Sequence, residues 1–209
     1  MILATDMLAA TQVSTDPFPH VLVPGFVRAD ALEVVIRHLP PIARRGSFPI
    51  GSLRFGPAAQ ALMHELAGPG FRAAIAAKFG LDLNGAATML TLRGRTAERD
   101  GRIHCDSTAK RVTILLYLNR ESGAWNRHEG CLRLLRGPSD IENFAVEVPP
   151  VNGTLLAFPN SATAWHGHKQ FVGQRYVVQL NYMTNDSAAR AEIRRHRISA
   201  FLKRLIATK

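Results

Sequence analysis

The chain of 209 residues is 46% hydrophobic and 20% charged, a balance that is typical of a folded globular protein and excludes wholesale disorder. Its 26 lysines and arginines outnumber its 16 aspartates and glutamates, which gives a formal net charge of +10. No apolar run reaches the roughly 18 residues that a membrane span needs, and the opening residues lack the basic start of a signal peptide. We therefore expect one domain over residues 1–209 and a cytoplasmic location, with Cys105 and Cys131 as free thiols rather than a disulfide framework.

The first part of the chain, residues 1–87, is predicted to be mainly helical. Residues 29–39 place apolar side chains at helical spacing, and the following prolines, Pro40 and Pro41, end that helix. Two further helices are expected over 58–68 and 70–80, because each stretch has helical periodicity and closes on glycine. The apolar, proline-punctuated residues 17–27 indicate a short strand and a turn.

The pattern changes from helical to extended at about Thr88. Short runs rich in β-branched and apolar residues then follow one another, each bounded by Gly, Pro, Asn or Asp. The six runs are residues 88–95, 110–119, 130–136, 144–150, 153–160 and 174–183. No helix-length insertion separates them, which favours a jelly-roll core over residues 88–183 rather than a parallel sheet. The sequence therefore predicts a mainly β fold with flanking helices.

A basic helix is predicted over residues 184–209. From Ala188 to Lys209 the chain has seven basic residues against Glu192 alone, a net charge of +6. The favoured interpretation is a helix with a solvated basic face and an apolar stripe that packs on the domain. Contact with nucleic acid, an anionic membrane surface or an acidic partner stays open, although no aromatic residues alternate with the charges as in a stacking platform.

The chemistry of the chain is indicated by two separated motifs. His104 and Asp106 form an HxD pair just before an apolar run, and alternation in an extended segment would put both side chains on one face. Some sixty residues later, Trp165 precedes His166 and His168, either of which could supply a third ligand. Two imidazoles and one carboxylate on one face of a metal are the ligand set of non-haem Fe(II) oxygenases.

These motifs resemble the Fe(II)/2-oxoglutarate-dependent dioxygenases, particularly the prolyl 4-hydroxylase-like subgroup. In that family an arginine about nine residues after the distal histidine binds the distal carboxylate of 2-oxoglutarate, and Arg175 lies nine residues after His166. The family's V-T, three residues, Y-L-N strand is present as VTILLYLN and carries the same carboxylate-binding role to Tyr117. The family's glycine-rich GGxLR is altered to EGCLR, with Glu129 in place of the first glycine.

The resemblance implies a double-stranded β-helix core with His104, Asp106 and His166 as iron ligands. His166 is preferred over His168 for its spacing to Arg175. Arginine suits the cosubstrate because its guanidinium can bind a carboxylate through two parallel hydrogen bonds. Alternation along the strand from Arg175 makes Gln179 and Asn181 candidates for lining the pocket, and pairing to backbone is an equal alternative. Thr113, Phe158 and Trp165 are expected in the barrel core.

The implied reaction is decarboxylation of 2-oxoglutarate to succinate, coupled to oxidation of a substrate C–H bond. Fe(II), 2-oxoglutarate and O₂ are the expected cofactor and cosubstrates, with ascorbate as a further candidate. Asp106 favours hydroxylation or another oxidation over halogenation, since related halogenases replace this carboxylate with a small residue. The alternatives are a cupin-like metalloprotein that does not use 2-oxoglutarate, or a basic module that binds nucleic acid or a membrane surface.

The substrate is predicted only as a small molecule or a protein, with an anionic one favoured by the net charge of +10. Residues 44–57 and 121–129 are expected to form the rim of the pocket because, in this family, loops outside the barrel select the substrate. No nucleic-acid motif stands out, and the oligomeric state is open.

Overall fold

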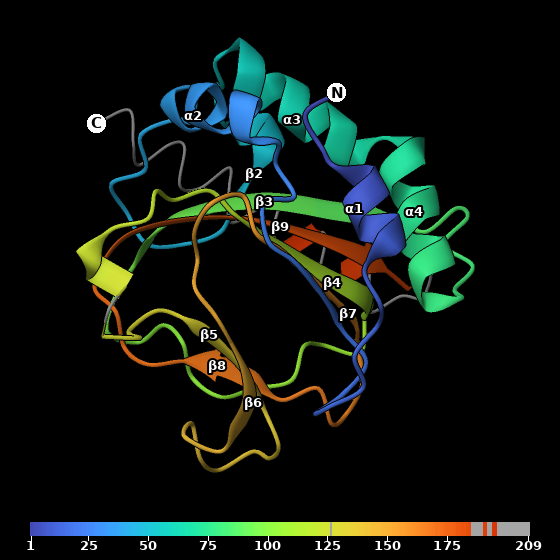
Figure 1. The fold of residues 1–209 in the computed structure, drawn as a ribbon, viewed down its shortest axis with the longest axis vertical. Helices are drawn as coiled ribbons and strands as arrows, with labels where there is room; N and C mark the ends of the chain where they lie inside the picture. The colour runs from blue at the N-terminus through green and yellow to red at the C-terminus, as the bar shows by residue number, and fades with distance from the viewer. Residues whose placement is uncertain (126, 185–189, 192–193, 196–209) are drawn as a thin grey trace.

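Four helices precede the β-rich part of the chain and cover one face of its larger sheet (Figure 1). The computed structural model describes residues 1–125, 127–184, 190–191 and 194–195. The helices are α1 (Thr5–Ala10), α2 (Ala29–Arg37), α3 (Pro57–Ala67) and α4 (Pro69–Phe79). A proline opens both α3 and α4, where its missing N–H costs no helical hydrogen bond, and Gly80 ends α4 in the left-handed conformation. None of the described helices is long and apolar enough to cross a membrane.

The larger sheet has six antiparallel strands in the order β1-β7-β4-β9-β3-β2. Their bounds are β1 (Val21–Val23), β2 (Phe48–Pro49), β3 (Thr88–Thr96), β4 (Lys110–Tyr117), β7 (Leu155–Pro159) and β9 (Gly173–Met183). The smaller sheet lies on the side away from the helices (Figure 1) and has the antiparallel order β6-β5-β8. Its strands are β5 (Leu132–Leu135), β6 (Phe144–Val148) and β8 (His166–His168). Two short 3-10 helices, Ile50–Ser52 and Gly123–Trp125, lie in connecting loops.

Alternation along the central strands divides the interior into two apolar clusters. One cluster fills the space between the helices and the larger sheet, and on β9 it takes Tyr176, Val178, Leu180 and Tyr182. The other lies between the two sheets and includes Val177 from the opposite face of β9, with Leu132 and Leu134 from β5. Side chains on a strand point alternately to opposite faces. The alternate residues of β9 from Arg175 to Asn181, which are Arg175, Val177, Gln179 and Asn181, therefore face the space between the sheets.

The fold predicted from the sequence is confirmed: a mainly β jelly-roll core with helices packed on one face. Each of the six predicted strands is present, as are the three predicted helices and the short strand β1. Helix α1 and the strands β2 and β8 were not predicted. The basic helix predicted over 184–209 lies mostly outside the described residues.

Candidate active site

The HxD pair and the distal histidine converge at one end of the space between the sheets. His104, Asp106 and His166 each offer one ligand atom, and these three atoms lie within 4.8 Å of one another. Backbone pairing fixes the two histidines, because His104 N donates to His166 O and His166 N donates to His104 O, both at 3.0 Å. The sequence predicted an extended segment that holds both HxD residues. In the structure only His104 makes a β-bridge, and Asp106 lies in the loop before β4.

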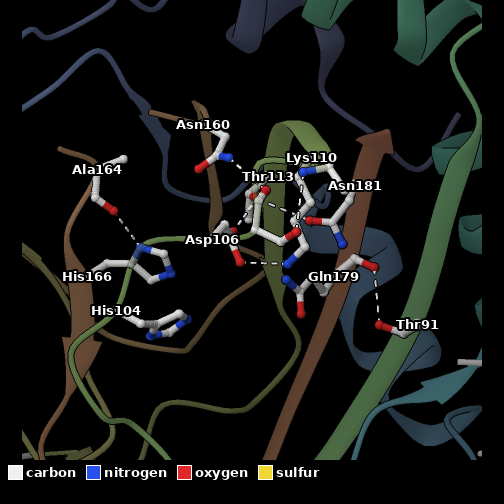
Figure 2. Close-up of polar contacts among 12 residues, drawn as sticks. Thr91, His104, Asp106, Lys110, Thr113, Asn160, Ala164, His166, Gln179 and Asn181 are labelled. Atoms are coloured by element: carbon white, nitrogen blue, oxygen red, sulfur yellow. Dashed lines mark hydrogen bonds and ion pairs between the residues drawn. The ribbon is translucent and has the colours of Figure 1, made fainter. Parts of the chain in front are cut away.

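Backbone carbonyls orient both imidazoles. The Nδ1 atom of His104 lies 2.8 Å from Arg102 O. The Nδ1 atom of His166 lies 2.9 Å from Ala164 O (Figure 2). A carbonyl only accepts hydrogen bonds, so each Nδ1 carries the proton and each Nε2 keeps a lone pair for a metal. Burial, with a smaller contribution from the nearby His104, lowers the pKa of His166 to about 4. His166 is therefore neutral near pH 7, as a metal ligand must be.

Side-chain donors engage both oxygens of Asp106. Lys110 Nζ lies 2.6 Å from Oδ1, and the hydroxyl of Thr113 donates to Oδ2 (Figure 2). Burial would raise the pKa of this carboxyl, but the positive charge of Lys110 and these hydrogen bonds outweigh burial and hold the pKa below its usual value. Asp106 is therefore an ionised carboxylate, the form that ligates a metal.

Arg175 and Tyr117 lie together between the sheets. The Arg175 side chain is buried, its Nε donates to Gly130 O at 2.8 Å, and its Cζ lies 5.3 Å from the centre of the Tyr117 ring. Burial raises the pKa of Tyr117 to about 12, so its hydroxyl keeps its proton. That hydroxyl is fully buried and has no hydrogen-bond partner among the described residues. A buried donor without a partner beside a buried cation fits an arriving carboxylate.

A single cavity joins the histidine pair to Arg175 and Tyr117. Its lining includes His104 and His166 at one end, Arg175 and Tyr117 at the other, and Gln179. In the register of β4 and β9, Tyr117 pairs with Val177, whereas Leu115 pairs with Gln179, so Gln179 lies nearer the metal end than Arg175 does. Asn181 does not line the cavity but packs against Thr113.

His168 lines the same cavity but is not part of the cluster of three potential ligands. Its Nδ1 lies 2.7 Å from Lys169 O, and its ring lies close to Gly101. Burial, with a smaller contribution from the charge of Arg175, lowers the pKa of His168 to about 4. The structure therefore brings His166, and not His168, to the HxD pair.

The residues present fit the ligands expected from the sequence. Two imidazoles and a carboxylate form a donor set suited to Fe(II). The Arg175 guanidinium and the unpartnered Tyr117 hydroxyl suit the second carboxylate of a dicarboxylate that reaches from the metal.

Three residues of the site were not assigned a role from the sequence. Thr113 was expected only as barrel core, yet its hydroxyl holds Asp106. Lys110 follows Asp106 by four residues, but that spacing indicates contact only in a helix. Arg93 lines the cavity from β3. Thr113 and Tyr117 lie an even number of residues apart on one strand, so their side chains point to the same face. This is the sequence signal that could have identified Thr113.

The two loops expected at the rim, 44–57 and 121–129, contribute no described residue to the cavity lining. Arg45 of the first loop does reach Asp100, with 2.9 Å between Nη2 and Oδ1, next to the lining residue Gly101. Their role in substrate selection stays a prediction.

Comparisons with known proteins agree with this site. The model of the 2OG-Fe(II) oxygenase superfamily matches residues 94–183. A prolyl 4-hydroxylase from Pseudomonas putida is 20% identical with a TM-score of 0.55, and the match covers 87% of this chain and 97% of that one. A prolyl hydroxylase from Trichoplax adhaerens, solved with a peptide fragment of the hypoxia inducible factor oxygen degradation domain, is 17% identical with a TM-score of 0.54 and 90% coverage of both chains.

No curated protein sequence gives a significant match. At identities of 17 to 20% the structural likeness shows the fold, and the family match covers residues 94–183. The matched segment contains the HxD pair, His166, Tyr117 and Arg175. The resemblance found in the sequence is thus confirmed: residues 94–183 match the model of the 2OG-Fe(II) oxygenase superfamily, and the fold is like that of prolyl 4-hydroxylases.

Proposed function

We propose that this protein is an Fe(II)- and 2-oxoglutarate-dependent hydroxylase. The observation that carries the proposal is the shared cavity: it is lined by the two histidines of the His-Asp-His cluster, by a buried arginine, and by a tyrosine whose hydroxyl has no hydrogen-bond partner among the described residues. A metal site alone would fit many enzymes. The additional cation and hydrogen-bond donor select a ligand that chelates the metal and carries a second carboxylate.

The superfamily uses Fe(II), 2-oxoglutarate and O₂. In our proposal His104, Asp106 and His166 hold the metal. The bound iron supplies the oxidation, in which O₂, 2-oxoglutarate and a substrate C–H become succinate, CO₂ and C–OH. Three ligands on one face leave the opposite face for the cosubstrate and O₂.

The chain's own residues bind and orient the cosubstrate. Arg175 would pair with the distal carboxylate of 2-oxoglutarate and Tyr117 would donate a hydrogen bond to the same group, while Gln179 lines the wall near the metal. The apolar residues between these polar ones, Leu115, Leu132 and Val177, also line the cavity and limit water there. Charge pairing is stronger in such a low-dielectric space than at the surface.

The test is 2-oxoglutarate turnover by the full chain with Fe(II) and O₂, measured as succinate formed. We expect His104→Ala and Asp106→Ala to abolish turnover and weaken metal binding. Arg175→Ala should mainly weaken 2-oxoglutarate binding to the anaerobic Fe(II) protein, measured from the visible charge-transfer band. His64→Ala, an exposed histidine on α3, is the matched control and should behave as wild type.

Two outcomes would contradict the proposal. Full turnover by Asp106→Ala would show that the metal assignment is wrong. Metal binding by the wild type without any effect of 2-oxoglutarate would favour the cupin-like alternative instead. For the substrate, a small molecule or a protein, the readout is a mass gain of one oxygen in metabolite and peptide pools.

A further inference from the structure

Asp106 is held differently from the other two members of the triad. Backbone carbonyls, which the fold itself positions, orient His104 and His166. The Asp106 carboxylate instead depends on two side chains, Lys110 at Oδ1 and Thr113 at Oδ2. The direction in which this ligand points is thus set by residues that can be changed one at a time.

Thr113 also contacts the side chain of Asn181, and the number of protons available for this contact decides how the two groups are hydrogen-bonded. Its Oγ1 lies 3.1 Å from Asn181 Oδ1, and both side chains are fully buried (Figure 2). A threonine hydroxyl has one proton and can donate to one acceptor at a time. The charged Asp106 carboxylate is the stronger acceptor, so the contact between the two oxygens of Thr113 and Asn181 has no proton.

The amide of Asn181 offers the missing donor. Its Nδ2 is buried and has no hydrogen-bond partner among the described residues. Amide oxygen and nitrogen positions are assigned from the hydrogen bonds that they make, and a half-turn of the amide exchanges the two atoms. Nδ2 then donates to Thr113 Oγ1, whose own proton is committed to Asp106. The amide oxygen then lacks a partner, which costs less than an orphaned N–H.

We propose that Asn181 and Thr113 form a directed hydrogen-bond chain, from amide to hydroxyl to carboxylate, that orients Asp106 for the metal. Thr113 is thereby a positioning residue of the iron site, which rests on the hydroxylase function proposed above. The residues come from three separate segments: β9, β4 and the loop before β4. The central pair of strands therefore fixes a ligand that belongs to neither strand.

Lys110 and Thr113 make separable contributions to Asp106. Lys110 matches the charge of the carboxylate, and both side chains of this ion pair are nearly buried. Thr113 contributes no charge, so replacing it leaves the charge balance intact and changes only the hydrogen bond. Hydrogen-bond partners of metal ligands typically contribute about 10- to 100-fold to metal affinity.

The test compares three variants of the full chain. Thr113→Val has the same shape without the hydroxyl, and Thr113→Ser keeps the hydroxyl. Thr91→Val removes a buried hydroxyl from the same face of the larger sheet, on β3, which pairs with β9. We expect Thr113→Val to weaken Mn(II) affinity, measured by calorimetry, by about tenfold or more. Thr113→Ser and Thr91→Val should stay close to wild type.

Spectroscopy separates positioning from loss of fold. Anaerobic Fe(II) protein with saturating 2-oxoglutarate should show a shifted charge-transfer band in Thr113→Val and an unshifted band in Thr113→Ser. Once saturated with metal, Thr113→Val should bind 2-oxoglutarate with wild-type affinity, because Arg175 and Tyr117 are unchanged. If Thr113→Val does not fold, Thr113→Ala serves in its place, and Asn181→Leu should give a smaller loss of Mn(II) affinity.

Wild-type Mn(II) affinity and an unshifted band in folded Thr113→Val or Thr113→Ala would overturn this inference. The hydroxylase proposal has its own control. If His104→Ala also kept wild-type Mn(II) affinity, the metal assignment itself would be wrong, whereas loss in His104→Ala alone would leave the metal site in place and remove only the role of Thr113.

Discussion

The Tyr117 hydroxyl is the clearest case in which one residue is arranged for a ligand rather than for the fold. It is buried without a hydrogen-bond partner among the residues that the structure describes, and a buried donor left unpaired costs about 1–3 kcal/mol. Tyr117→Phe should therefore make the ligand-free protein more stable and its 2-oxoglutarate affinity weaker. Thermal unfolding and 2-oxoglutarate titration of the same sample measure both effects. A variant that is less stable and binds normally would show that the hydroxyl serves packing alone.

The two buried histidines predict how stability depends on pH in the metal-free protein. Burial is the main cause that lowers the pKa of both His166 and His168 from 6.5 to about 4. When the pH falls below about 6.5, these two histidines take up protons in the unfolded chain but stay neutral in the folded chain until the pH approaches 4. The free energy of unfolding should therefore decrease between pH 6.5 and about 4, by at most about 1.4 kcal/mol per pH unit for each histidine.

His168→Asn tests this dependence without changing a triad residue. The variant lacks one of the two groups, so chemical denaturation at pH 7, 6 and 5 should show a shallower decline than in the wild type. An unchanged slope would mean that His168 is solvated and titrates normally in the folded state.

At the scale of elements, the loop that carries the HxD pair is held against β8 by close backbone contact. Gly101 has a φ of +89°, and a Cβ there would lie 2.5 Å from the His168 ring and backbone. A Cβ on Gly167, on β8 itself, would lie 2.9 Å from Gly101 O. These contacts bring His104 within reach of His166.

Gly101→Ala should push this loop away from β8 and weaken metal affinity at least tenfold. Gly137→Ala is the matched control, since no atom lies within 4 Å of an added Cβ and φ is not positive there. The measurement is Mn(II) affinity with circular dichroism as a check on the fold. Equal affinity in the two variants would show that the loop adapts without moving His104.

The same elements show what the sequence could and could not predict. Strands such as β4 and β9 are long enough for alternation to be visible, so their positions followed from the pattern. Alternation from Arg175 also placed Gln179 in the cavity, whereas Tyr117 and Arg175 themselves were assigned from the family resemblance. The three-residue β8 is too short to show a period, and it exists because His166 pairs with His104 and β5 pairs alongside it. The choice of His166 rested on a nine-residue spacing. The parity of Thr113 with Tyr117 could have placed its side chain between the sheets, but the contacts of Lys110 and Thr113 with Asp106 depend on the path of the loop before β4, which no local pattern indicates.

At the scale of the whole molecule, the larger sheet separates a structural core from the site. Leu62 on α3 belongs to the cluster under the helices, and Leu134 on β5 belongs to the cluster between the sheets. Leu62→Ala should lower the free energy of unfolding by about 2–5 kcal/mol and leave the metal affinity unchanged. Leu134→Ala should lower both, because Leu134 pairs with His166 in the smaller sheet.

Denaturant unfolding and Mn(II) titration of these two variants provide the check. Equal loss of metal affinity in both would show that the two clusters are energetically coupled through the sheet.

Proposals on substrate depend on neither cluster, and the positive charge of the chain makes an anionic substrate the first class to screen.

Alternate residues of strand β9 serve two different parts of the structure. Tyr176, Val178 and Leu180 face the helices, while Arg175 and Gln179 line the cavity and Asn181 contacts Thr113. A mutation at one set is nearly silent for the other, so evolution can change what the cavity accepts without disturbing how the helices pack. An insertion of one residue, in contrast, would exchange the two sets along the rest of the strand and end both roles at once. Such a strand tolerates substitution far more readily than a change in length.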